Sequence, residues 1–171
     1  MKIYFIRHNF NQREIINPIL EKQKRIAIHF NDEEYTELEQ FSNSAKTNKF
    51  LNAWKWFSEL RQNAGIVVAQ YQSNYCYIGR VKPNTQVVFL DELKTEGLYG
   101  YKTLKMVSPQ KVDYCQFPLL SAIRPMYSTI SPIAERNYDY IMYAYEKEDL
   151  KFDCQAKVEM SYSYQNRNVL F

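Results

Sequence analysis

The sequence predicts a single α+β domain in which five or six short strands form a small curved sheet or barrel with flanking helices. Its 171 residues suit one domain. Its hydrophobic content of 46% is enough for a packed core. Short apolar runs at close spacing, with one amphipathic helix among them, favour a strongly curved sheet. We expect the core to span about residues 1–130 and residues 131–171 to form a C-terminal extension.

The first thirty residues predict a strand, a helical segment and a second strand. The apolar runs Ile3 to Ile6 and Ile26 to Phe30 are each the length of a short strand. Between them, Pro18 either interrupts a helix or restarts it with Asn17 as the N-cap.

The range from Phe50 to Asn63 has the clearest helical pattern. Gly65 stands where such a helix should stop. One apolar stripe recurs at helical spacing, formed by Phe50, Ala53, Trp54, Phe57, Leu60 and Ala64.

The stretch from Ala64 to Pro83 reads as a strand, a turn and a strand, and its first arm is continuously apolar, as a buried strand should be. The turn and second arm carry three tyrosines and two cations: Tyr71, Tyr75, Tyr77, Arg80 and Lys82. These side chains either cap the core or face a flat ligand and its phosphates. Tyrosines that alternate along a hairpin usually pack their rings and expose their hydroxyls, so the local sequence favours capping.

Two more strands are predicted beyond the hairpin, at Gln86 to Leu90 and at Tyr101 to Val107, where the side chains alternate. Three prolines make residues 117–132 an ordered connection rather than a regular element. Tyr138 to Tyr145 fits either a short helix or a strand.

Composition excludes several classes of function. Four glycines and no nucleotide motif argue against a Gly-rich phosphate loop. Three widely spaced cysteines without a CxxC pair suggest neither a zinc site nor a disulfide framework, so we expect no metal, no cofactor and a reducing, cytoplasmic setting. No apolar run approaches a signal peptide or a membrane span. The net charge of +3 permits nucleic-acid binding without demanding it.

The order of these elements resembles the PUA-like superfamily, specifically its EVE, YTH and ASCH branches. The resemblance lies in three stretches, Ile3 to Phe10, Arg25 to Asp32, and Gly65 to Tyr71 paired with Tyr77 to Val81. The second strand of that hairpin contains Ile78-Gly79-Arg80-Val81, which is similar to a common xIGxV pattern of the family. Residues 101–103 and 117–125 also resemble N-terminal segments of some prokaryotic restriction and defence proteins.

This resemblance implies a nucleic-acid reader that holds a single base, often a modified one, between the first strand, the second strand and the hairpin. Carried over by position, the pocket candidates are His8, Asn9, His29, Asn31, Tyr71 and Ser73. The tryptophan that many relatives place after the second strand is absent, and His29 and Phe30 stand there instead. That difference argues against a methyl-recognising aromatic cage and leaves open another pocket for a flipped base.

Cations would have to contact the phosphates that flank such a base. The candidates lie mostly in the barrel half of the chain: Arg80, Lys82, Lys102, Lys105 and Arg124, to which Arg7 and Arg25 can add. The resemblance thus implies nucleic acid as the partner, DNA in preference to RNA, with a nuclease or motor on the same longer chain or on a separate subunit. The chain would be the specificity part of a restriction or anti-phage system.

Two other classes of function stay open. A tyrosine-rich surface could bind a partner protein, because tyrosine is a common anchor of such interfaces. A small hydrolase of nucleotides or RNA ranks last. Glu92 and Lys94 match the ExK half of a metal-dependent nuclease site, but no acid lies between Glu59 and Asp91 to complete it. The lack of a catalytic constellation favours a binding module over an enzyme.

Overall fold

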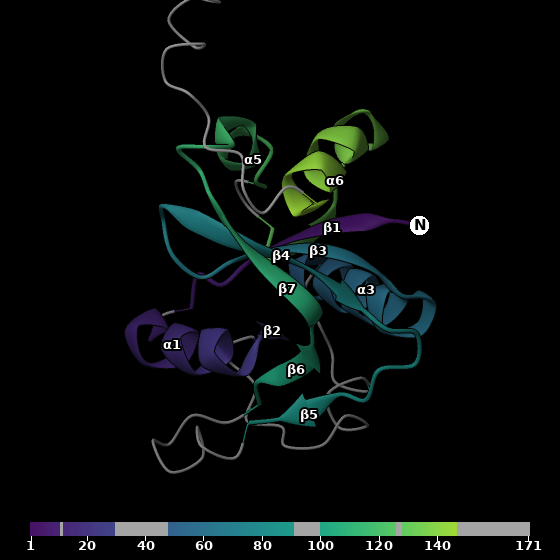
Figure 1. The fold of residues 1–171 in the computed structure, drawn as a ribbon. Helices are drawn as coiled ribbons and strands as arrows, with labels where there is room; N and C mark the ends of the chain where they lie inside the picture. The colour runs from purple at the N-terminus through teal and green to yellow at the C-terminus, as the bar shows by residue number, and fades with distance from the viewer. Residues whose placement is uncertain (11, 30–47, 91–99, 126–127, 147–171) are drawn as a thin grey trace, which may run out of the picture.

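The computed structural model describes residues 1–10, 12–29, 48–90, 100–125 and 128–146, and they form an α+β fold (Figure 1). The predicted α+β class is confirmed. The elements in chain order are β1 (Ile3–Arg7), α1 (Arg13–Gln23), β2 (Arg25–Ile28), α3 (Asn48–Asn63), β3 (Gly65–Gln70), β4 (Tyr75–Val81), β5 (Val88–Phe89), β6 (Lys102–Lys105), β7 (Val107–Asp113), α5 (Pro118–Ala122), β8 (Ile130–Pro132), a 3-10 turn (Glu135–Asn137) and α6 (Tyr138–Glu146).

The strands of these ranges make two sheets. The larger has the order β7-β4-β3-β1-β8, and the smaller has the order β2-β6-β5. Strands β1 and β3 are parallel, with Arg7 opposite Gln70, and all other neighbours are antiparallel. Parallel neighbours end on the same side of a sheet, so the carboxyl ends of β1 and β3 lie next to each other.

A sharp bend joins the two sheets. Strand β6 ends at Lys105 and β7 begins at Val107, with Met106 alone between them. The Met106 N–H donates to the Lys24 carbonyl at 2.9 Å, which holds the bend against the end of α1. Within the described part of the chain, the strands thus form two sheets joined by a bend and no closed barrel.

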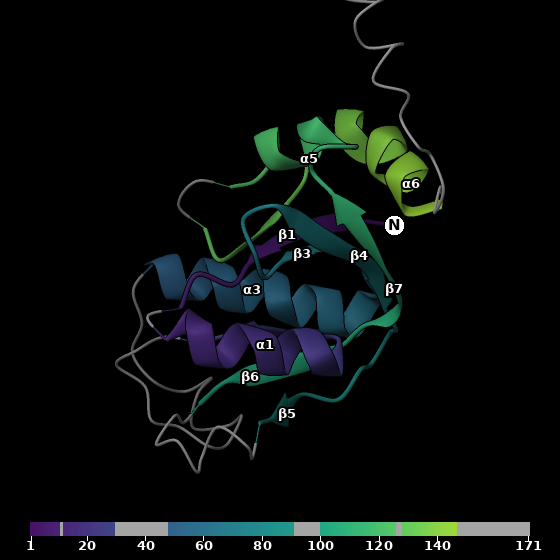
Figure 2. The same ribbon diagram turned by 60° about the vertical axis from the view of Figure 1, so that its left-hand side comes forward.

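The larger sheet is buried on both faces. Helices α5 and α6 cover one face, while α1, α3 and the smaller sheet lie on the other (Figures 1 and 2). Along β1, Tyr4 and Ile6 join the core on the α1 and α3 side, whereas Ile3 and Phe5 join the core beneath α5 and α6. This two-sided burial is the reason that the central strands read as continuous apolar runs.

The core does not stop near residue 130. Ile141, Ala144 and Tyr145 of α6 belong to the second core cluster, against the outer face of the larger sheet. The range that we expected to be an extension therefore begins with structural elements. Among the helices of the described ranges, none combines the length and the apolar character needed to cross a bilayer.

The predicted helix at 50–63 is confirmed, but its end differs in detail. The residue in the left-handed conformation is Ala64, with φ of 65°, and Gly65 is already the first residue of β3. Glycine is needed at position 65 for another reason: a Cβ there would lie 2.9 Å from both Leu60 Cδ1 and the Lys2 carbonyl oxygen.

Three other expectations need correction. Helix α1 runs through Pro18 without interruption, and Asn17 lies inside the helix, not at its N-cap. Strand β7 was not predicted, because it is a polar edge strand that contains Pro109 and buries few side chains. The connection at 117–132 holds the short helix α5 and strand β8. The open alternative at residues 138–145 is resolved as a helix.

Candidate ligand-binding site

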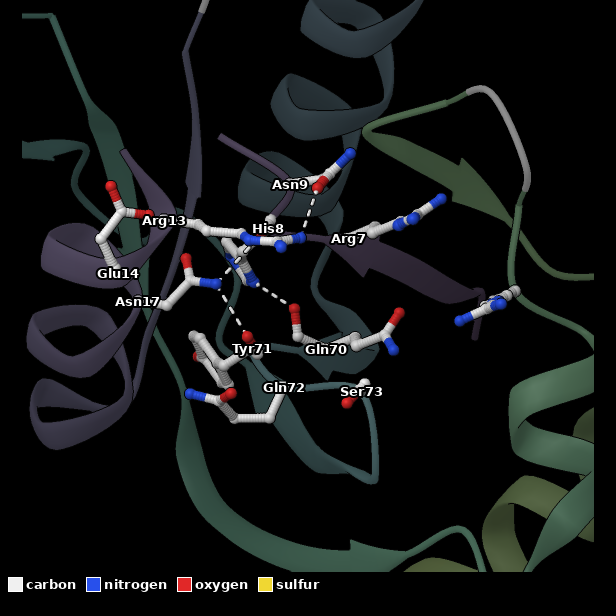
Figure 3. Close-up of a pocket in the computed structure, with 11 residues that line it drawn as sticks. Arg7, His8, Asn9, Arg13, Glu14, Asn17, Gln70, Tyr71, Gln72 and Ser73 are labelled. Atoms are coloured by element: carbon white, nitrogen blue, oxygen red, sulfur yellow. Dashed lines mark hydrogen bonds between the residues drawn. The ribbon is translucent and has the colours of Figure 1, made fainter. Parts of the chain in front are cut away.

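A cavity of about 450 Å³ lies beside the carboxyl ends of β1 and β3 (Figure 3). Its size falls in the roughly 300–1,000 Å³ range of small-molecule sites. Ligands of mixed and parallel sheets commonly bind outside the carboxyl ends of strands. Four segments contribute the lining: the end of β1 and the residues after it (Arg7, His8, Asn9), α1 (Arg13, Glu14, Asn17), the end of β3 and its turn (Gln70, Tyr71, Gln72, Ser73), and the residue Arg124 after α5.

His8 joins three strands behind this cavity. Its Nε2 lies 3.1 Å from the Ala27 N–H and accepts from it, so Nδ1 carries the proton and donates to the Gln70 carbonyl at 3.0 Å. Burial lowers the pKa of His8 from 6.5 to about 4, against a smaller opposing effect of the Gln70 carbonyl. His8 is therefore neutral at physiological pH, and both of its ring nitrogens are used within the fold.

Asn17 ties α1 to the same strand ends. Its Nδ2 donates to the carbonyls of His8 at 2.9 Å and Tyr71 at 2.7 Å (Figure 3). Both partners are carbonyl oxygens, which can only accept, so the amide nitrogen of Asn17 must face them and its oxygen must face away. The helix thus anchors itself to the loop after β1 and the turn after β3 at one point, and this point is the inner wall of the cavity.

Tyr71 is also held by the fold. Its ring stacks parallel on His8 with centroids 4.5 Å apart, and its hydroxyl donates to the Arg25 carbonyl at 2.6 Å. Burial raises the pKa of Tyr71 well above its usual value of 10. One ring face and the hydroxyl are therefore not available to a ligand.

The charge around the cavity is positive. Arg7, Arg13 and Arg124 line it together with one acid, Glu14, while His8 stays neutral. Arg13 lies across the mouth of the cavity, where its Nη1 donates to Asn9 Oδ1 at 3.4 Å (Figure 3). Such a site attracts an anionic group, and guanidinium groups suit phosphate oxygens.

The structure brings together five of the predicted site residues. His8, Asn9, Tyr71, Ser73 and Arg124 all line the cavity. His8 and Tyr71 serve as its framework, while the exposed Asn9, Ser73 and Arg124 are open to a ligand.

Two other predicted pocket residues do not join them. His29 lies elsewhere, with its ring stacked on Tyr101 at a centroid distance of 4.0 Å. Asn31 lies outside the described residues. The predicted pocket therefore needs correction, because residues of α1 line it and His29 does not.

Arg80 and Lys82 lie at the far end of the hairpin. Arg80 pairs with Ile66, near the start of β3, whereas the cavity begins where β3 ends. At about 3.3 Å per residue this separates them by roughly 13 Å along the strand. The Arg80 guanidinium instead lies over the Tyr145 ring at 5.6 Å.

Three other cations proposed for phosphate contact also lie away from the cavity. Lys102 is completely buried in β6, and Lys105 donates to the Gln23 carbonyl at 2.6 Å. Arg25 donates to Thr103 Oγ1 at 3.1 Å. Of the predicted cations, only Arg7 and Arg124 line the cavity.

Five lining residues were not predicted from the sequence: Arg13, Glu14, Asn17, Gln70 and Gln72. A signal for the first three was present, because a helix beginning near Arg13 places positions 13, 14 and 17 on one face. Gln70 could have been noticed as the polar residue that directly ends a buried apolar strand.

The hairpin tyrosines cap the core. The hydroxyls of Tyr75 and Tyr77 both donate to Glu21 of α1, Tyr75 at 2.9 Å and Tyr77 at 3.2 Å. Lys24 Nζ lies 3.9 Å from the centre of the Tyr77 ring, and Lys111 Nζ lies 3.8 Å from that of Tyr75. These rings therefore pin α1 to the sheet and do not line the cavity.

The two cysteines in the described part of the chain do not form a reactive centre with the cavity. Cys76 is buried in β4, and burial raises the pKa of its thiol to about 12. Cys115 is exposed and lies outside the lining. Across the described ranges no three His, Cys, Asp or Glu side chains are grouped so as to hold a metal ion, and Glu92 lies outside those ranges.

Comparison of the chain with family models, with curated proteins and with solved structures found no match.

Proposed function

We propose that the chain is a nucleic-acid-binding module that holds one flipped base in the cavity at the carboxyl ends of β1 and β3. The observation that carries the proposal is a cavity with a polar inner wall of amides and a mouth with three arginines. A nucleotide has the matching two parts, a planar ring with hydrogen-bonding groups and an anionic phosphate.

Phosphate binding is supported by the positions of the three arginines as much as by their number. Arg7 comes from β1, Arg13 from the first turn of α1, and Arg124 from the segment after α5. Three separate segments thus bring guanidinium groups to one mouth, although the whole chain carries a net charge of only +3. Clustering of this kind is the electrostatic footprint expected of a phosphate-binding site.

Hydrogen bonding, not stacking, would supply most of the recognition. His8 covers one face of the Tyr71 ring. The lining offers side-chain amides at Asn9, Asn17 and Gln70, and amides can donate to and accept from a base edge. Extruding a base costs a few kcal/mol, which such hydrogen bonds and phosphate contacts have to offset.

The proposal also includes the family, the kind of nucleic acid and the biological role. A PUA-like identity is supported by the order of the elements. The partner would be DNA in preference to RNA, the base modified or simply flipped, and the role that of a specificity part in a restriction or anti-phage system with a nuclease or motor. These features rest on the resemblance alone.

The tyrosine-surface alternative has less support. Of the tyrosines in the described ranges, Tyr143 on α6 is the exposed one, with 42% of its surface accessible. The others are at least half-buried in the two cores, as expected of tyrosines that cap a core.

Equilibrium titration with a fluorescein-labelled DNA duplex that contains one unpaired base tests the proposal. Arg13→Ala combined with Arg124→Ala should weaken binding at least about tenfold, because two phosphate contacts are lost. Arg80→Ala combined with Lys82→Ala removes the same charge from exposed positions at the other end of the hairpin and should leave the affinity within about twofold. Equal losses in the two double variants, or no binding by the wild type even at low salt, would show the proposal to be wrong.

A further inference from the structure

The arginines that line the cavity come from opposite faces of the larger sheet. Arg13 belongs to α1, whose Ile16 and Leu20 pack in the core on the α1 and α3 side. Arg124 follows α5, whose Leu120 packs in the second core, on the other face of the sheet (Figures 1 and 2). Both arginines are exposed, and both line the same cavity. The cavity therefore lies across the end of the sheet and receives a cation from each face.

The third arginine, Arg7, belongs to the side of Arg124. Side chains alternate between the two faces along a strand. In β1, Phe5 packs in the core beneath α5 and α6, whereas Ile6 packs in the core against α1 and α3. Arg7 follows Ile6 as the last residue of the strand, so its side chain leaves on the α5 and α6 side. In agreement with this, the side chain of Arg7 extends away from that of Arg13 (Figure 3).

Arg13 is oriented on the α1 side by a neighbour at the mouth. Its Nη1 donates to Asn9 Oδ1 at 3.4 Å, and both residues are exposed there. A guanidinium group has several N–H donors, so this contact leaves others for an anionic ligand. The mouth thus has two separate positions for an anion, one at Arg13 and one at Arg124 together with Arg7.

The charge of the lining matches two phosphodiester groups. Three arginines and one glutamate line the cavity, and His8 is neutral, so the lining has a net charge of two positive units. Each phosphodiester of a strand carries one negative charge. One linkage therefore leaves the mouth unbalanced, whereas two balance it. A nucleotide inside a strand has two such linkages, one on the 5′ side and one on the 3′ side of its sugar.

We propose that the site takes a nucleotide from the interior of a strand and holds its two flanking phosphates separately, one at Arg13 and the other at Arg124. This inference rests on the proposed function and adds the course of the strand. The backbone crosses the end of the larger sheet from the α1 face to the α5 face, and the extruded base enters the cavity between the two phosphates. A terminal nucleotide or a free mononucleotide would fill only one of the two positions.

Neutral linkages placed on either side of the base test this arrangement. The probe is the labelled duplex with one unpaired base, in which the phosphodiester on the 5′ side or on the 3′ side of that base is replaced by an uncharged methylphosphonate. For the wild type, each replacement should weaken binding at least about fivefold, because each removes one charge-assisted contact.

The two arginine variants should respond to different sides. In Arg13→Ala, replacement on one side should change the affinity by less than about twofold, since its partner is already gone, while the other side keeps the effect seen in the wild type. In Arg124→Ala the two sides should exchange roles. Arg80→Ala is the control, because Arg80 is an exposed arginine at the far end of the hairpin, and both replacements should keep their full effect there.

The outcomes separate the two proposals. If both variants become insensitive to the same side, or if neither replacement weakens binding by the wild type, the separate holding of two phosphates is wrong, while a nucleic-acid-binding module remains in place. If the wild type does not bind the unmodified duplex even at low salt, the proposed function is wrong, and this inference with it.

Discussion

At the scale of single residues, His8 decides the geometry of the site. It accepts from β2, donates to β3 and itself follows β1, so one imidazole holds the three strand ends at fixed distances. Its stacking on Tyr71 extends the same restraint to the turn after β3. Its function is structural, because no ring nitrogen is left for a ligand.

His8 makes the stability depend on pH. The unfolded chain takes up a proton on this residue below about pH 6.5, whereas the native state takes it up only near its pKa of about 4. The contribution of His8 is therefore complete above pH 6.5 and is lost as the pH falls toward 4. Between pH 6.5 and pH 5 the free energy of unfolding should fall by about 2 kcal/mol.

Urea unfolding at several pH values measures this effect, and His8→Gln isolates it because glutamine does not titrate. The difference in free energy of unfolding between wild type and variant should shrink by that amount as the pH falls. A difference that stays constant over the same range would mean that His8 is not buried as a neutral ring.

Single residues of the site were partly predictable from the sequence. His8, Asn9, Tyr71 and Ser73 follow directly after apolar strands, and residues that follow neighbouring strands meet at one end of a sheet. Arg80 and Lys82 were wrongly assigned to the site because they follow the hairpin tyrosines closely in the sequence. Strand β4 runs antiparallel to β3, so it carries both residues away from the cavity. Asn17 was missed because its neighbour Pro18 suggested a break in the helix.

At the scale of elements, the connection between α1 and the hairpin sets the shape of the cavity. Glu21 accepts from two tyrosine hydroxyls on β4 at one end of the helix, and Asn17 bonds to the strand ends nearer the other. The helix is thereby fixed along its length, and its first turn presents Arg13 and Glu14 at the mouth.

Removal of Glu21 tests this connection. Glu21→Ala leaves two tyrosine hydroxyls without their acceptor and should lower the free energy of unfolding by about 2 kcal/mol. Glu14→Ala removes an exposed acid of the same helix and should change it by less than about 0.5 kcal/mol. Chemical denaturation of both variants is the measurement, and similar losses in the two would contradict the account.

A second prediction at the scale of elements concerns Gly65, at the junction of α3 and β3. In Gly65→Ala the new Cβ would lie 2.9 Å from the Leu60 side chain and from the Lys2 carbonyl, so backbone has to shift. We expect a loss of about 2 kcal/mol or more in the free energy of unfolding.

Gly79→Ala is the comparison for that variant. Its nearest contacts, at 3.3 Å, include the Met106 side chain, which can adjust. The loss should therefore be smaller than for Gly65→Ala. If thermal and chemical denaturation show a larger loss of stability for Gly79→Ala than for Gly65→Ala, then α3 and β1 do not approach each other closely at Gly65.

The elements were predicted where their pattern reflects burial. Strands β1 and β3 and helix α3 each carry a strong apolar signal because they lie in the cores. Strand β7 lies at the edge of the larger sheet with mostly polar residues, so its pairing with β4 depends on tertiary contacts that no local pattern records. The same holds for α5 and β8, which are short and flanked by prolines.

At the scale of the whole molecule, the fold brings together one polar cavity from segments that are far apart in the sequence. The lining residues 7–9, 13, 14, 17, 70–73 and 124 meet because β1 and β3 run parallel and α1 folds back across their ends. The larger sheet is covered by helices on both faces, so ligand access is at the strand ends (Figure 2). The position of the cavity is thus a consequence of topology, while its positive charge is a property of this sequence.

The salt dependence of oligonucleotide binding tests the central claim most directly. For the wild type, the logarithm of the binding constant should fall steeply and linearly with the logarithm of the salt concentration, because phosphate contacts release counterions. The Arg13→Ala and Arg124→Ala double variant should reduce the size of that slope by about 2, and the Arg80→Ala and Lys82→Ala variant should leave it unchanged. A wild-type slope near zero, or an equal reduction in both double variants, would contradict the claim that phosphates bind at the mouth of this cavity.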